Sequence, residues 1–178
     1  MTACAIKLSL TAATCTCMTL PAAAPAMASS IADQAIASFN AVCFKAGQTA
    51  QQARKRMQTR DGTPLPYRLT FWDKTLEPAP GTPAQLDRHC EVSFSGDHRP
   101  KAISALKKQM TTPPVFGFSI DLPETHRRTS ETAFIEGREL LRGRVAVVQV
   151  GLRSYDGGME TFMNVERLTP EVSREVGK

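Results

Sequence analysis

The sequence predicts an α+β fold, with one antiparallel sheet of about five or six strands, helices packed on one face, and one disulfide. Two segments near the start and the middle of the chain repeat apolar residues at helical spacing. Several later segments alternate apolar and polar residues and are joined by short turns. Such an order favours an antiparallel sheet over parallel βαβ units.

Residues 1–28 have the features of a secretory signal peptide. Lys7 is their one charged side chain, and the apolar stretch "LSLTAATCTCMTL" behind it is short for a membrane-spanning helix. The segment ends in "AMA", the small-residue pattern that signal peptidase needs. We therefore expect cleavage after Ala28, which leaves a single periplasmic or secreted domain, residues 29–178, with no stable membrane span.

The leader carries Cys4, Cys15 and Cys17, so its removal leaves Cys43 and Cys90. We expect these two cysteines to form a disulfide in an oxidising compartment, and their apolar surroundings favour a buried bridge over a reactive thiol. Two other interpretations stay open, a lipoprotein modified in the leader and a retained metal or redox site. The first has only "AAT" as its recognition box, and the second lacks a polar scaffold.

The charge balance points to anionic or protein partners. The whole chain has a net charge of +5, and loss of Lys7 with the leader lowers it by one. A mildly basic exported domain suits an acidic protein or an anionic envelope component. Nucleic acid is not expected, because no aromatic residues interleave the basic ones as in a stacking surface.

The first element is a helix that begins after Ser30, an N-cap residue, with Asp33 in its first turn. Gly47 ends it. Its apolar stripe consists of Ile31, Ala35, Phe39, Val42 and Cys43. Thr49 and Gln52 form a capping box that starts a second helix of about ten residues.

Two strands follow, "YRLTFWD" at 67–73 and "RHCEVSFSG" at 88–96, with a proline-rich loop between them. Alternation places Cys90 on the buried side of the second strand. The expected disulfide therefore joins the first helix to this strand.

A third helix is predicted over 99–110, with Asp97 able to cap it. A third strand is predicted in "TTPPVFGFSIDLP". The side chains expected on one side of this strand are Phe116, Phe118, Ile120 and Leu122.

The remaining strands are predicted in "AFIEGREL", "RGRVAVVQVGL" and "METFMNVERL". The turn "SYDGGM" connects the last two as a hairpin, because Asp-Gly suits a tight turn. The tail after Pro170 is expected to fray or form a short helix. No internal repeat and no second domain is present in the sequence.

No catalytic or metal site is predicted. His89, His98 and His126 lack metal-ligand spacing, and no G-x-S-x-G motif is present. Ser95, Asp97 and His98 lie close in sequence but are more simply a strand end and a helix cap. No cofactor is expected, and a small periplasmic hydrolase stays open as the alternative function.

Two features are candidate binding residues. Trp72 lies on the polar side of its strand and could anchor a partner, or it could pack under the loop at 77–83. Arginines near the last strands could form an anion-facing patch, although the sequence does not establish that they share a face. These candidates are Arg138, Arg142 and Arg144, with Arg153 beyond them.

The motifs "FNAVC", "FWDK" and "HCEVSF" resemble small exported proteins of unknown function from Gram-negative bacteria, over about residues 35–150. The resemblance implies no catalytic residue and supports a periplasmic address. Together with the composition, it leads us to expect a non-catalytic binding or interaction domain for a protein or an envelope component.

Overall fold

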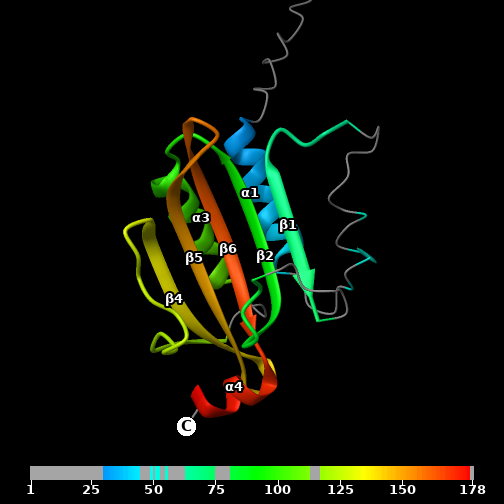
Figure 1. The fold of residues 1–178 in the computed structure, drawn as a ribbon, viewed down its shortest axis with the longest axis vertical. Coiled ribbons are helices and arrows are strands. Elements are labelled where there is room, and N and C mark those ends of the chain that lie inside the picture. Colours follow the sequence, from blue (N-terminus) through cyan, green and yellow to red (C-terminus); the bar gives the residue numbers. More distant parts are fainter. Residues whose placement is uncertain are drawn as a thin grey trace, which may run out of the picture.

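The computed structural model describes residues 30–44, 49, 51–52, 55, 63–74, 81–112 and 117–176. Six strands form one antiparallel sheet in the order β1-β2-β6-β5-β4-β3 (Figure 1). The elements are α1 (Ile31–Val42), β1 (Arg68–Asp73), β2 (Leu86–Ser95), α3 (Arg99–Met110), β3 (Phe118–Ile120), β4 (Thr132–Leu140), a 3₁₀ turn (Leu141–Gly143), β5 (Arg144–Tyr155), β6 (Gly158–Leu168) and α4 (Pro170–Val176). The predicted α+β class is confirmed.

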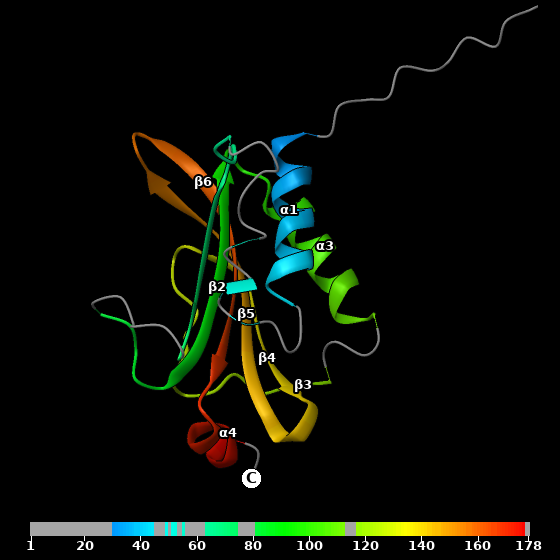
Figure 2. The same cartoon turned by 90° about the vertical axis from the view of Figure 1, so that its right-hand side faces the viewer.

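The main core lies between one face of the sheet and the helices α1 and α3, which lie side by side on it (Figure 2). Alternation along the strands sends every second side chain into this layer. Fully buried side chains of the core include Phe39, Phe94, Leu106, Val148, Val150 and Met163. The face that these two helices cover is called the helix face below, and the other is called the open face.

The disulfide between Cys43 and Cys90 joins the C-terminal end of α1 to the middle of β2. The two Cα atoms are 5.3 Å apart, and both side chains are buried. Cys90 belongs to the helix face together with Val92 and Phe94. The predicted bridge between the helix layer and the second strand is therefore confirmed.

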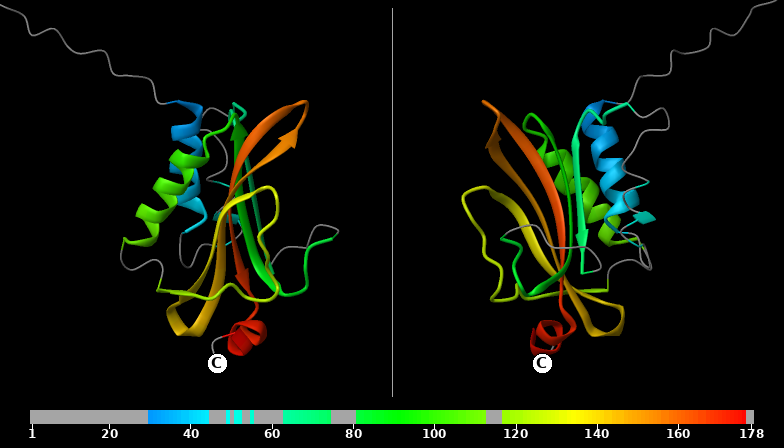
Figure 3. Two further views of the ribbon diagram at one scale, coloured as in Figure 1. Left: turned by 90° about the vertical axis from the view of Figure 1, so that its left-hand side faces the viewer. Right: turned by 45° about the vertical axis from the view of Figure 1, so that its right-hand side comes forward.

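α4 packs on the open face rather than beside α1 and α3 (Figure 3). Its Val172 and Val176 contact a second apolar cluster, formed by Leu86, Val145 and Leu168. Val145 and Leu168 point to the open face because they alternate with core residues of β5 and β6. The sequence predicted helices on one face only. α4 departs from this because the lower end of the open face is itself apolar.

The segment 121–131 also lies against the open face, on the side opposite α1 and α3 (Figure 3). The Leu152 N–H donates to the Glu131 carbonyl, 2.9 Å away. A Cβ added at Gly151 would lie 2.4 Å from that carbonyl oxygen, so only glycine allows this close approach. The upper end of the open face, near the β5–β6 turn, remains accessible.

Three local predictions differ from the structure or are only partly confirmed. β3 is shorter than expected, and Phe118 is 78% exposed, because an edge strand has a neighbour on one side only. His98 is the N-cap residue of α3, while the Asp97 carboxylate accepts the Arg99 N–H at 3.2 Å. The capping box of Thr49 and Gln52 forms, but most of that helix, like Phe116, lies outside the described residues.

The β5–β6 turn agrees with its sequence. Asp156 and Gly157 both have positive φ, 49° and 75°, as the tight turn of a two-residue hairpin needs. The hairpin carries Tyr155 and Met159 at its tip, both exposed. Within the described ranges, no helix is long and apolar enough to cross a bilayer.

Candidate functional site

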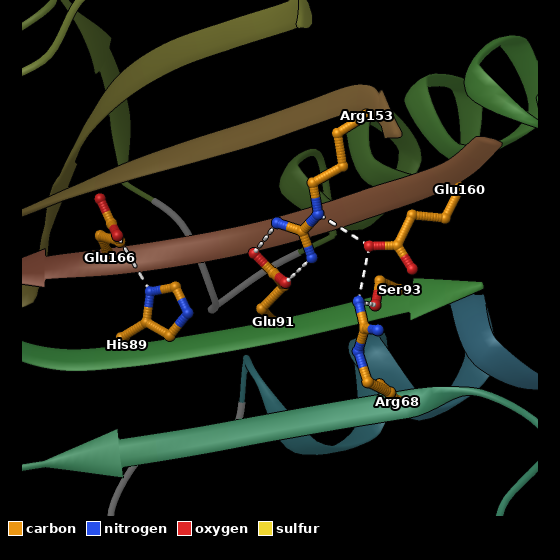
Figure 4. A network of polar contacts seen from close by, with 7 residues as sticks. All are labelled: Arg68, His89, Glu91, Ser93, Arg153, Glu160 and Glu166. Carbon is orange, nitrogen blue, oxygen red and sulfur yellow. Dashed lines mark hydrogen bonds and ion pairs between the residues drawn. The ribbon is translucent and has the colours of Figure 1, made fainter. Parts of the chain in front are cut away.

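A chain of ion pairs crosses the upper open face over four strands (Figure 4). Its members are Arg68 from β1, Glu91 from β2, Arg153 from β5 and Glu160 from β6. All four lie on the face opposite the helix-face core, since Glu91 alternates with Cys90 and Val92, and Arg153 is the cross-strand partner of Glu160. Charged side chains therefore take the place that a second apolar layer would occupy.

The ion pairs are close, and their two carboxylates are more buried than Arg68, whose side chain is 39% exposed. Glu160 Oε1 lies 2.6 Å from Arg68 Nη2 and 2.7 Å from Arg153 Nε. Arg153 Nη2 lies 2.6 Å from Glu91 Oε1. Burial lowers the pKa of Arg153, but the hydrogen bonds with Glu91 and Glu160 and the negative charges of these residues raise it by more. The net pKa of Arg153 is therefore above its ordinary value, and the guanidinium stays charged.

Arg68 connects this network to a groove at the hairpin tip. Its guanidinium lies 3.5 Å from the centre of the Tyr155 ring, in cation–π geometry, and donates to Ser93 Oγ at 2.9 Å. The groove has a volume of about 440 Å³ between residues 65–68 and 155–160. Tyr155 is 53% exposed and Met159 is 46% exposed. We call this the hairpin-tip groove.

A second polar cluster lies lower on the open face, around Glu166. His89 Nδ1 is 2.9 Å from Glu166 Oε1, and His126 Nε2 is 2.8 Å from Glu166 Oε2. Thr125 Oγ1 in turn lies 2.8 Å from His126 Nδ1. The cluster therefore fastens the segment 121–131 to β6.

Glu166 has a low pKa in this cluster. Burial raises it, but hydrogen bonds from His126 and His89, and their charges, outweigh burial and hold the pKa of Glu166 at about 2. Because the folded pKa lies below its ordinary value of 4.5, the stabilisation is present above pH 4.5 and is lost as the pH falls towards 2.

We therefore expect Glu166→Gln to lower the free energy of unfolding near pH 5.5 by about 2–3 kcal/mol. The difference from the unchanged protein should shrink as the pH falls below 4.5 and vanish near pH 2, where the carboxylate is neutralised in the folded state as well. Urea titrations of both proteins between pH 2.5 and 7 measure this. A difference that stays constant over that range would contradict the role given to Glu166.

Of the residues that lie close in sequence at 95–98, His98 is the N-cap residue of α3. The hydrolase alternative stays a prediction. Asp97 pairs with Arg99 at 2.6 Å, and Ser93 Oγ accepts from Arg68. Thr125 bonds to the imidazole of its sequence neighbour, a local contact that fixes the ring of His126.

Trp72 is partly buried at the edge of the open face. It packs against the second apolar cluster, beside α4, and its Nε1 has no hydrogen-bond partner among the described residues. The loop at 77–83, under which it could pack, lies mostly outside the described residues. A binding role of Trp72 stays a prediction.

The candidate arginines occupy different surroundings. Arg138 pairs with Glu136 at 2.8 Å, and Arg144 pairs with Asp87. Arg142 is exposed in the 3₁₀ turn, with a positive φ of 66°. By strand alternation Arg138 and Arg144 lie on the helix face, whereas Arg153 lies on the open face and does not share a surface with them. Their role in binding stays a prediction.

Sequence reasoning missed Asp87, which is 1% exposed. Its carboxylate accepts from Arg144 and from Arg167 Nε, the latter at 2.7 Å. A β-bulge between Leu86 and Arg88 breaks the alternation of β2 and turns Asp87 towards these arginines. No residue pattern in the sequence marks that bulge.

In the part of the chain that the structure describes, no group of three or more His, Cys, Asp or Glu side chains is placed to hold a metal ion. No protein-family model, curated protein or solved structure matches this chain. Its function is therefore inferred from the geometry of its own surface.

Proposed function

We propose that this protein is an exported, disulfide-bonded domain that binds a protein partner through the hairpin-tip groove. The observation that carries the proposal is the exposure of Tyr155 and Met159 beside a guanidinium that is already fixed in place. Tyr, Met and Arg are the residue types that protein interfaces favour over the remaining surface. The groove thus offers an aromatic anchor, an apolar contact and a charged donor together.

The pairing of the charges favours a protein over an anionic envelope component at this groove. Each guanidinium on the upper open face already contacts a carboxylate, so an anion would have to displace Glu160 or Glu91. The Tyr155 ring and the Met159 thioether, in contrast, each keep about half of their surface open to a partner. Because Arg68 stacks on Tyr155, the ring loses less conformational freedom on binding.

Export is supported by three observations. The leader has the pattern of a signal peptide, the disulfide belongs to oxidising compartments, and the motifs resemble those of exported proteins. We propose a periplasmic or secreted location on these grounds. A disulfide that joins α1 to β2 stabilises the fold, which suits a domain that works outside the cytoplasm.

Tyr155→Ala should reduce recovery of the protein partner at least about tenfold, as loss of an aromatic hot spot does. The measurement is quantitative mass spectrometry of proteins captured from periplasmic extract by the tagged mature domain. Leu141→Ala is the matched control, because it also removes a large exposed apolar side chain, at the opposite end of β5. Equal recovery by the Tyr155 variant would refute the proposal, and so would an equal loss in both variants.

A further inference from the structure

A second and larger groove lies at the opposite end of the open face, with a volume of about 940 Å³. It runs between α4 and the segment 119–125, and we call it the α4 groove. Its apolar lining consists of Ile120, Leu122, Pro123, Val172 and Val176. Its acidic lining consists of Asp121, Glu124, Glu139 and Glu175, and no lysine, arginine or histidine lines it among the residues that the structure describes.

These four carboxylates differ from most others in the protein. None makes an ion pair with another described residue. Of the remaining acidic residues that the structure describes, all but Glu131 and Asp156 do make one. Uncompensated negative charge is thus gathered at one groove of a chain with a net charge of +5.

The α4 groove is apolar as well as acidic, and its apolar residues form what is called its floor. Ile120, Val172 and Val176 pack on the second apolar cluster and are only partly buried by it. Phe118, 78% exposed, is the cross-strand neighbour of Glu139 and extends this apolar surface beyond the groove. An occupant must therefore cover apolar area while it neutralises carboxylates.

We propose that the α4 groove binds a basic segment of a partner protein, with aliphatic side chains on the floor and lysine or arginine at the rim. Charge complementarity selects the sign of the partner, since unlike charges across an interface attract and like charges exclude the wrong partner. A single small cation would leave the apolar floor exposed, which a peptide of alternating character covers. This site is separate from the hairpin-tip groove and does not depend on it.

The test uses the purified mature domain and a labelled ten-residue peptide of alternating Lys and Leu, with binding followed by fluorescence anisotropy. Glu139→Gln with Glu175→Gln should raise the Kd about fivefold, as the loss of two exposed charge pairs does. Asp121→Asn with Glu124→Gln tests the two carboxylates of the segment 119–125 and should have a similar effect. The unchanged domain should bind more weakly at 300 mM than at 50 mM salt.

Glu131→Gln with Asp156→Asn is the matched control, because it removes two unpaired carboxylates outside the groove. This control should change the Kd less than about twofold. An equal loss in the control would show that net charge alone attracts the peptide. Absence of binding, or equal binding of a Glu and Leu peptide, would also overturn the proposal, whereas Tyr155→Ala should leave this binding unchanged.

Discussion

Replacing Cys43 and Cys90 together with alanine is expected to lower the free energy of unfolding by about 4 kcal/mol. The bond closes a loop with a sequence separation of 47, and this closure limits the unfolded chain. Both side chains are buried, and alanine is chosen over serine because it adds no unpaired hydroxyl to the core. Against a typical total stability of about 5–15 kcal/mol, the variant would be close to unfolding at raised temperature.

Urea denaturation of the oxidised domain and of the double variant measures the difference. Reduction of the unchanged domain should give nearly the same loss, and the reductant should have no effect on the double variant. A loss below about 1 kcal/mol in both experiments would contradict the stabilising role of the bond.

Asp87→Asn is expected to lower the free energy of unfolding by about 3–5 kcal/mol, because it leaves two partly buried guanidinium groups without their buried counter-ion. Arg144 and Arg167 both donate to this carboxylate, and Arg88 lies close enough for its charge to be felt. The amide keeps the size of the side chain but loses its charge and one acceptor. The loss of stability comes from Arg144 and Arg167, whose positive charges would no longer be neutralised.

The matched control is Asp33→Asn. Asp33 pairs with Lys101 on the surface, with 43% of its side chain exposed, so its loss should change the free energy of unfolding far less than Asp87→Asn does. Denaturation in urea at pH 7 compares the two variants. Equal effects at Asp33 and Asp87 would show that burial gives the Asp87 cluster no special weight.

The residues of the helix-face core could be predicted from the sequence, because they follow the spacing of apolar residues along helices and strands. The stripe of α1 ends at Phe39, Val42 and Cys43, and the alternation of β2 places Cys90 on the same layer. The turn at Asp156 and Gly157 fixes the register of the last hairpin, so Arg153 opposite Glu160 follows from it.

The rest of the site depends on long-range pairing that no local pattern encodes. Glu91 on β2 reaches Arg153 on β5 across the single strand β6 that separates them in the sheet. In the sequence, four other elements separate β2 from β5. Arg68 meets Glu160 across 92 positions of the sequence. The bulge at Asp87 reverses an alternation that the residues alone would continue.

The proposed maturation has three steps: export of the chain, removal of the leader and formation of the bond between Cys43 and Cys90. The most direct measurement is the mass of the protein made with its own leader in a Gram-negative host and recovered from the periplasm, before and after thiol alkylation. We expect a chain that begins at Ser29, has a mass two hydrogens below that of the reduced chain and takes up no alkylating agent. A chain that keeps residues 1–28, or carries two alkylated cysteines, would contradict it.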